Sequence, residues 1–414
     1  MTANTQAKPS PKALKPLDVA LDELLVHAQP LGETDWVSTF AADRRVLAQN
    51  LISELQVPPQ DNSSMDGYAV RCADLASGHP LPVTQRIPAG TSGVPLAMRS
   101  VARIFTGAPI PQGADAVVMQ EACEVMADGR VLVKEAVEPG QWIRRSGEDV
   151  RRGEAVLLRG ERLNPASLGL AAGIGVADLP VVRQPRVALF STGDELVMPG
   201  AIAPASMAPG AIYNSNRFFL RALLERIGCM VSDMGIVPDQ RLATVQALRQ
   251  ASQAHDLILT SGGVSVGEED HIKPAVQELG HLDLWQIGMK PGKPFAYGRV
   301  GSAHFVGLPG NPVSSYVTFL LLVRPFLLKL QGATAWQWPA QQRRAGFDWP
   351  RGDKRREFLR VREGTDGDLA LFANQSSGVL SSVVWGDGLV DNPAGQTISK
   401  GDLVRYLPFS AVLS

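Results

Sequence analysis

Two glycine-rich loops, each placed after a short apolar run, constrain the fold of this chain more than any other feature. The first, Ser261-Gly-Gly-Val-Ser-Val-Gly267, follows an apolar run that starts at Asp256. The second follows the run that starts at Phe305, and there Asn311 suits a helix N-cap and Pro312 the first helical position. Glycines let the backbone approach a ligand, and helix N-termini favour anions, so these loops predict an anion site. A purely connecting role in an α/β sheet remains the alternative.

The segment around these loops alternates between strand and helix patterns. The predicted strands cover residues 186–190, 230–237 and 256–260, and the predicted helices cover residues 217–227 and 241–253, with Asn214 or Ser215 as a cap. Such alternation predicts a parallel, doubly wound sheet with helices on both faces. Ligands of such sheets bind at the carboxyl ends of the strands.

Acidic and basic residues follow the predicted strands at that edge. Each acid alone is typical of a surface loop, but four at one edge predict a site for a hard divalent cation such as Mg²⁺: Asp194, Glu195, Asp239 and Asp270. Lys290 and Lys293, in Lys-Pro-Gly-Lys, are placed to neutralise an anion and to stabilise charge during its cleavage. The residue types therefore fit a magnesium-assisted reaction at a phosphate anhydride.

Charge and cysteine content limit the classes of partner. The net charge of −1 removes any general argument for nucleic acid or an anionic membrane as a partner. Three cysteines, an odd number and widely separated, are typical of reduced thiols and predict a cytoplasmic location. Residues 1–16 contain no apolar core of a signal peptide. The apolar stretch 316–330 is interrupted by Arg324-Pro325 and is too short to span a bilayer, so it predicts a buried core helix.

The rest of the 414-residue chain predicts further domains. Apolar spacing predicts an amphipathic helix over residues 17–27 and a second helix over about 35–51. Short strands separated by glycine and proline over residues 80–150 predict a compact, inserted β-rich domain. Residues 161–182 read as a helix-like stretch that leads out of the insertion, and strand patterns from about residue 333 predict a small C-terminal β domain.

Several motifs resemble those of the MoeA family, the molybdopterin molybdenumtransferases, whose superfamily includes gephyrin and Cnx1. They are Asp61-Asn-Ser-Ser-Met-Asp-Gly-Tyr-Ala69, Thr106-Gly-Ala-Pro-Ile-Pro-Gln-Gly113, Ser261-Gly-Gly-Val-Ser-Val-Gly-Glu268, Lys290-Pro-Gly-Lys-Pro294 and Gly307-Leu-Pro-Gly-Asn-Pro-Val-Ser314. Ser64 stands where the family commonly has alanine, and Ser376 where it usually has glycine. The resemblance implies a multidomain α/β fold: a MogA-like αβα domain (9–27 and 185–332), an elongated connector (28–47 and 154–184), an inserted β-rich domain (48–153) and a C-terminal small β-barrel domain (333–414).

The resemblance also implies roles for individual residues. Without it, the loop around Asp61 could be read as a well-made turn. The candidates for catalysis are Asp61, Thr106, Asp149, Glu195, Lys290 and Lys293. The candidates for substrate binding are Arg144, Ser261, Gly262, Gly263, Ser265, Gly267, Pro309 and Pro312, with Arg360 and Ser377 as candidates for holding molybdate.

By the same resemblance, the substrates are adenylated molybdopterin and molybdate, and AMP is released as molybdenum is inserted. The family works as a homodimer whose clefts combine both subunits, and other cofactor-biosynthesis proteins are candidate partners. Two alternatives stay open. A molybdopterin adenylyltransferase would accumulate adenylate from ATP without molybdate, and a non-enzymatic, gephyrin-like scaffold would lose a partner complex, but not molybdenum insertion, on surface mutation.

Overall fold

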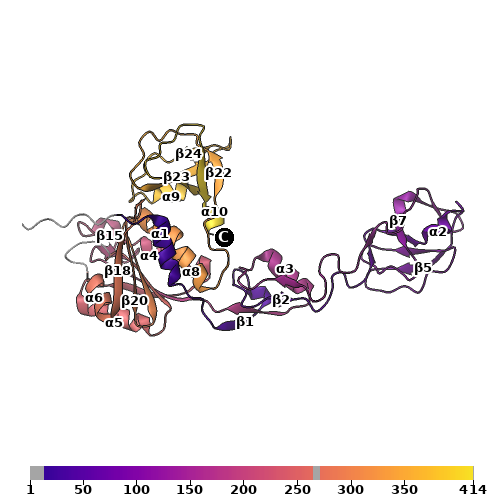
Figure 1. The fold of residues 1–414 in the computed structure, drawn as a ribbon, viewed down its shortest axis with the longest axis horizontal. Helices are drawn as coiled ribbons and strands as arrows, with labels where there is room; N and C mark the ends of the chain where they lie inside the picture. The colour runs from indigo at the N-terminus through magenta and orange to yellow at the C-terminus, as the bar shows by residue number, and fades with distance from the viewer. Residues whose placement is uncertain (1–13, 264–270, 414) are drawn as a thin grey trace, which may run out of the picture.

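The computed structural model describes residues 14–263 and 271–413 of the chain. Figure 1 shows an elongated molecule with an α/β body at one end and a β-rich domain at the other, joined by a slender connector. The C-terminal β strands form a further body beside the α/β body. The chain is therefore a multidomain α/β protein, and the exact residues of the predicted domain boundaries remain a prediction.

The α/β body is built on a six-stranded sheet in the order β16-β13-β17-β21-β20-β18. Its strands are β13 (Arg186–Thr192), β16 (Met230–Val237), β17 (Leu257–Ser261), β18 (Gly280–Gln286), β20 (Pro294–Val300) and β21 (Ala303–Leu308). The first four strands in the sheet order are parallel, whereas β20 runs antiparallel to its two neighbours, β21 and β18. The wholly parallel sheet predicted from the sequence is thus wrong at one side. The tight turn at Gly301 between β20 and β21 leaves no room for a crossover and returns the chain antiparallel.

Helices cover both faces of this sheet. They are α1 (Leu17–Val26), α4 (Asn216–Ile227), α5 (Arg241–Ser252), α6 (Ile272–Leu279), α7 (Pro312–Thr318) and α8 (Arg324–Leu330). Alternate residues of β13 enter different cores: Val187 and Leu189 pack with α1, α4, α7 and α8, while Ala188 and Phe190 pack with α5 and α6. The doubly wound arrangement follows from this alternation of apolar side chains.

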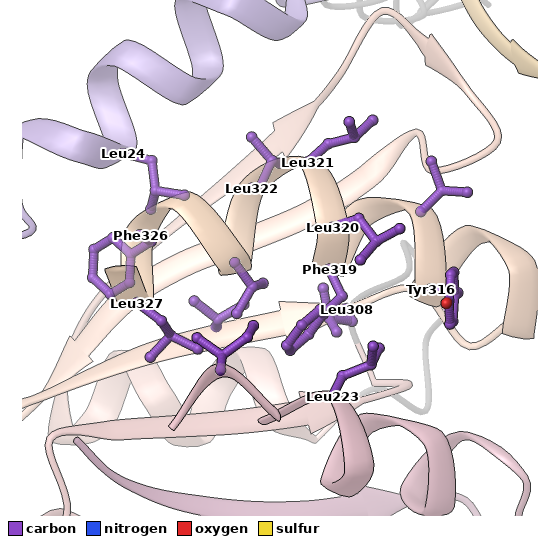
Figure 2. Close-up of a cluster of buried hydrophobic side chains, with 14 of the residues drawn as sticks. Leu24, Leu223, Leu308, Tyr316, Phe319, Leu320, Leu321, Leu322, Phe326 and Leu327 are labelled. Atoms are coloured by element: carbon purple, nitrogen blue, oxygen red, sulfur yellow. The ribbon is translucent and has the colours of Figure 1, made fainter. Parts of the chain in front are cut away.

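The buried helix that the sequence predicts is the central element of the larger core (Figure 2). It runs over Pro312–Leu330, with a π-helical segment, η4 (Phe319–Val323), between α7 and α8, and 94% of its apolar stretch is buried in the protein. Pro325 has no amide hydrogen for the carbonyl of Leu321, four residues earlier. The indole Nε1 of Trp338 donates to that oxygen at 3.2 Å, so the helix continues through the proline.

The connector contains strands where the sequence predicts helix. β1 (Thr34–Ser38) pairs with β12 (Asp178–Val182), β2 (Leu51–Ile52) pairs with β11 (Ala155–Leu157), and between them lie η1 (Thr39–Ala41) and α3 (Pro165–Gly173). The helix predicted over 35–51 is wrong, and the one predicted over 161–182 is limited to α3. Pairing between segments about 140 residues apart decides these conformations, and local periodicity does not report it.

The β-rich domain holds a four-stranded sheet in the order β5-β6-β4-β7. Its elements are β3 (Asn62–Ser63), β4 (Gly67–Val70), α2 (Cys72–Leu75), β5 (Val83–Ile87), β6 (Val101–Ile104), β7 (Ala116–Met119), η2 (Gln120–Ala122), β8 (Cys123–Val125), β9 (Val131–Val133) and β10 (Ile143–Arg144). β3 pairs with β10, which brings together two of the loops that carry predicted site residues.

The C-terminal body is a mixed sheet in the order β19-β23-β25-β26-β22, with β24 paired to β23. Its elements are β19 (Met289–Lys290), β22 (Gln341–Arg344), β23 (Arg356–Glu363), β24 (Leu369–Leu371), α9 (Ser381–Trp385), β25 (Gly388–Asn392), β26 (Leu403–Pro408) and α10 (Phe409–Val412). β19 belongs in sequence to the α/β body but pairs with β23. A closed barrel remains a prediction.

A buried histidine should make the stability of the fold depend on pH. Burial, together with the nearby charges of Arg299 and His27, lowers the pKa of His304 to about 4, and its Nδ1 lies 2.9 Å from Tyr297 Oη. Between about pH 6.5 and pH 4, this histidine binds a proton in the unfolded chain but stays neutral in the folded chain. The free energy of unfolding therefore falls as the pH drops through this range, by at most about 3 kcal/mol. Urea unfolding at several pH values measures this loss. His304→Asn should flatten the profile over this range, and His281→Asn, at an exposed position, should not.

Candidate functional site

A cavity of about 800 Å³ lies at the carboxyl ends of β13, β17 and β21. Its wall is formed by the loops that follow these strands, by the segment before α4, and by Gly378 of the C-terminal body. The predicted site residues that line it are Glu195, Asp239, Ser261, Gly262, Gly263, Pro309 and Pro312. Chain segments far apart in sequence meet here because parallel strands end at the same edge of the sheet.

Two hydrogen-bond donors in the wall lack protein partners among residues 14–263 and 271–413. Asn214 is 2% exposed, and its Oδ1 accepts the backbone N–H of Arg217 at 3.3 Å, while its Nδ2 has no partner. Thr192 Oγ1 is likewise buried without a partner. Buried polar atoms are almost always hydrogen-bonded, so both groups are available to a ligand. The sequence marked Asn214 only as a helix cap.

A third amide holds the two glycine loops together. Asn216 Nδ2 donates to Ser261 Oγ and to the carbonyl oxygen of Gly310, both at 2.7 Å. These bonds join the loop after β17 to the loop after β21, and thereby fix the wall of the cavity beside the start of the helix at Pro312.

The glycines of the first loop are required by space and by backbone conformation. Gly262 and Gly263 have φ values of +92° and +67°. A Cβ atom at Gly263 would lie 2.6 Å from Ile272 Cγ1 and 2.8 Å from Thr192 Oγ1. Any side chain there would therefore displace neighbouring atoms as well as strain the backbone. The predicted residues Ser265, Gly267 and Asp270 lie outside the described residues.

The cavity wall is acidic. Glu195 and Asp239 line it, and none of its described lining residues is Lys, Arg or His. The carboxylate of Glu195 has no hydrogen bond or ion pair within the described part of the chain, and Asp194 Oδ1 accepts the backbone N–H of Asp239 at 3.2 Å. Three of the four predicted metal ligands thus lie at one edge of the sheet. No three His, Cys, Asp or Glu side chains outside the 264–270 gap and the termini come together as a ready metal site.

The two lysines are not where the sequence placed them, beside these carboxylates. Because β19 pairs with β23, Lys290 Nζ lies 3.2 Å from Glu357 Oε1 and 3.3 Å from Asp353 Oδ2. Hydrogen bonds from Arg355 hold the pKa of Asp353 well below its usual range, so that carboxyl stays charged. Lys293 is exposed, and neither lysine lines the cavity, although Pro294 does.

Arg360 is a buried cation that contacts the loop containing Ser376 and Gly378, and Gly378 of this loop lines the cavity. Its guanidinium donates to Ser382 Oγ at 3.1 Å and to the carbonyl oxygens of Phe358 and Ser376 at 3.0 and 3.3 Å, and burial lowers its pKa to about 10. Arg360 pairs with no carboxylate among the described residues. Ser377 accepts the backbone N–H of Val313 on its carbonyl oxygen at 3.0 Å, which ties this loop to α7.

The remaining predicted residues gather in the β-rich domain, at the opposite end of the molecule (Figure 1). Asp61 accepts the backbone N–H of Ser146 at 2.8 Å and binds Arg145 Nη1 at 2.7 Å, and the first of these bonds leads in lowering its pKa. Thr106 donates twice to Asp66, and Arg144 and Asp149 are exposed nearby on the segment that contains β10. The sequence did not assign Arg145 or Asp66 to the site, because only the pairing of β3 with β10 brings Arg145 to Asp61, and only that of β4 with β6 brings Asp66 to Thr106. One chain does not bring this cluster to the cavity.

Three domain families match the chain in order. They are the MoeA N-terminal region (domain I and II) over residues 15–175, the probable molybdopterin binding domain over residues 188–329, and the MoeA C-terminal region (domain IV) over residues 342–409. A Haemophilus influenzae protein named molybdopterin molybdenumtransferase is 39% identical over 96% of this chain and 99% of its own length. A Mycobacterium tuberculosis protein named molybdopterin molybdenumtransferase 2 is 37% identical over 84% of this chain and 88% of its own length.

Solved structures resemble the fold over the same extent. A molybdopterin biosynthesis moeA protein from Pyrococcus horikoshii OT3 superimposes with a TM-score of 0.82 at 28% identity, covering 95% of this chain and 99% of its own. Sequence and fold therefore agree along nearly the whole length.

Proposed function

Because this chain belongs to the molybdopterin molybdenumtransferase family, we propose that it inserts molybdate into adenylated molybdopterin and releases AMP, with Mg²⁺ as cofactor. The family predicted from the sequence motifs is confirmed, and with it a transferase role in molybdenum cofactor biosynthesis. The adenylated substrate, the magnesium ion and the roles of single residues are the parts that we propose.

The observation that carries the proposal is the acidic cavity at the carboxyl ends of three strands. An adenylated pterin phosphate carries several negative charges, and the described wall offers Glu195 and Asp239 but no basic side chain. Repulsion between such a ligand and these carboxylates would be strong without a cation between them. Carboxylates that face phosphate oxygens across a cavity are the donor set that suits Mg²⁺.

We assign Glu195 and Asp239, supported by Asp194 and Asp270, as the residues that would hold the ion. When bound, Mg²⁺ would neutralise charge on the phosphate oxygens as the anhydride is cleaved. The chain's own contribution is positioning: Asn214 Nδ2 and Thr192 Oγ1 supply unpaired donors, and the helix that starts at Pro312 turns its positive end toward the cavity. The glycines after β17 let the substrate approach the backbone.

Molybdate, the second substrate, is assigned to the side of the cavity that faces the C-terminal body. Arg360 is a buried guanidinium without a carboxylate partner in the described chain, and a buried charge of this kind favours binding of an anion. The C-terminal sheet also includes Lys290, through the pairing of β19 with β23, and Lys293 follows β19 in sequence. Ser377 belongs to the C-terminal body as well. Molybdate is a tetrahedral dianion, which arginine, lysine and hydroxyl donors hold as they would hold a phosphate.

We further propose that two chains complete each site and that the enzyme works in the cytoplasm as a homodimer. The predicted catalytic residues Asp61, Thr106 and Asp149 lie in the β-rich domain, so a second copy is needed to bring them to the cavity. Trp36 and Phe40 of the connector are 66% and 101% exposed. Large apolar side chains at such exposure are typical of an interface.

Release of AMP from adenylated molybdopterin tests the proposal directly. We expect AMP, measured by chromatography, to appear only when molybdate and Mg²⁺ are both present, because one is the incoming group and the other neutralises the anhydride. A chelator should stop release, and restored Mg²⁺ should return it. Release that is independent of molybdate, or accumulation of adenylate from ATP and molybdopterin, would instead indicate the adenylyltransferase.

A further inference from the structure

The side chain of Asn216, at the start of α4, fixes the orientation of a neighbouring hydroxyl at the cavity. The carbonyl oxygen of Gly310 lies 2.7 Å from Asn216 Nδ2, and a carbonyl oxygen can only accept a hydrogen bond, so this atom must be the amide nitrogen. Ser261 Oγ lies 2.7 Å from the same nitrogen, so the serine oxygen is the acceptor of that bond. The hydroxyl hydrogen of Ser261 must therefore point away from Asn216.

That hydrogen has no acceptor within residues 14–263 and 271–413. Ser261 is 4% exposed and Asn216 is 8% exposed, and both residues line the cavity at the carboxyl ends of the strands. Buried hydrogen-bond donors are rarely left unpaired in proteins. A ligand in the cavity would supply the acceptor that the described chain does not.

We propose that Asn216 is a positioning residue, which occupies the acceptor side of the Ser261 hydroxyl and thereby directs its proton to a phosphate oxygen of the bound anhydride. This inference rests on the proposed function, in which the cavity holds an adenylated substrate. Ser261 makes the contact with the substrate, and Asn216 acts through it.

The other donors of the same wall favour a phosphate as the acceptor. Asn214 Nδ2 and Thr192 Oγ1 are buried without a partner in the part of the chain that the structure describes, and both residues line the cavity. The Ser261 hydroxyl adds a further donor to this wall. An ionised phosphate presents several acceptor oxygens, and hydrogen bonds to a charged acceptor are about twice as strong as those between neutral groups.

The bonds of Asn216 also fix the place of this donor before the substrate binds. Ser261 is the last residue of β17, and Gly310 lies in the loop between β21 and α7. One buried nitrogen holds both segments, and α4 supports it through Leu220 and Leu224, which are fully buried in the larger core. A donor that is already in place loses little conformational freedom on binding, which favours affinity.

The experiment uses the full-length protein and single turnovers of adenylated molybdopterin. Asn216→Asp reverses the hydrogen bond, because an ionised carboxylate can only accept and so takes the Ser261 proton away from the substrate. We expect the half-saturating concentration to rise roughly tenfold or more, since a bond to a charged group is lost. The limiting rate should change by less than about threefold, because the contact is present before and during cleavage.

Ser261→Ala tests the same contact without changing Asn216. It removes the donor, leaves the bond from Asn216 to Gly310, and should raise the half-saturating concentration about as much. Calorimetry with AMP and Mg²⁺ then identifies the acceptor. A parallel loss of AMP affinity in Ser261→Ala would place the bond on the nucleotide phosphate, and an unchanged AMP affinity would place it on the pterin phosphate.

The double variant separates action through Ser261 from repulsion by the added charge. The effect of Asn216→Asp on half-saturation should be at least about threefold smaller when Ser261→Ala has already removed the hydroxyl. Asn50→Asp, which adds the same charge at an exposed position of the connector, should leave half-saturation unchanged.

Two results would overturn the role of Asn216 while the proposed function stands. One is an equal effect of Asn216→Asp in both backgrounds, and the other is an unchanged half-saturating concentration in Ser261→Ala, a variant that answers the question even if Asn216→Asp does not fold. Failure of the wild type to turn over adenylated molybdopterin would instead overturn the proposed function, and this inference with it.

Discussion

Glu195→Gln is expected to slow molybdate-dependent AMP release by about 100- to 1,000-fold, a loss typical of removing one electrostatic group from an active site. Glu195 is one of two acids that line the described wall of the larger cavity, and its carboxylate has no partner there among the described residues. The substitution keeps the shape and removes the charge. The free energy of unfolding should therefore change by less than about 0.5 kcal/mol, as for other surface substitutions.

The rate is measured as AMP formed in a single turnover, and the stability by urea unfolding of the same preparation. Glu225→Gln is the matched control, because Glu225 is exposed on α4 and forms its ion pair within the described chain with Arg221, outside the cavity. It should keep the wild-type rate. A wild-type rate in Glu195→Gln would show that the cavity at the strand ends is not the site of cleavage.

Activity should return when two inactive variants, Asp61→Asn and Glu195→Gln, are unfolded, mixed in equal amounts and refolded together. Asp61 lies in the β-rich domain, and Glu195 lies in the α/β body at the other end of the chain (Figure 1). If each site combines the two ends from different subunits, a mixed dimer contains one intact site and one doubly altered site. Random pairing then restores roughly a quarter of the wild-type activity.

A mixture of Asp61→Asn with Thr106→Val is the control, because both residues lie in the same cluster: the backbone N–H of Ile110, in the loop that starts at Thr106, donates to the carbonyl oxygen of Asp61 at 3.0 Å. That mixture should stay inactive, since every site in it contains one of the two changes. Recovery in the control, or failure of recovery in the first mixture with dimers present, would contradict a site shared between subunits.

Several features of the fold and the site could be predicted from the sequence. The strands around Leu259 and Val306 are short apolar runs, and the helix over Pro312–Leu330 is apolar on all sides, so their burial follows from composition. Gly262 and Gly263 occupy positions where a side chain would be strained or would clash. Glycines at such positions could be recognised in the sequence as a loop beside a ligand site. Acids that directly follow parallel strands must meet at one edge, and Glu195 and Asp239 do.

Only the tertiary structure decided which distant groups pair. The connector strand β1 forms because it finds β12, and β19 carries Lys290 to Glu357 in the C-terminal body, away from the acids of the cavity. Arg360 and Arg324 are ordinary arginines in the sequence, and the packing buries both side chains with no acidic partner among the described residues. Local patterns report what a residue prefers by itself, whereas pairing and desolvation depend on chain segments that the fold alone brings together.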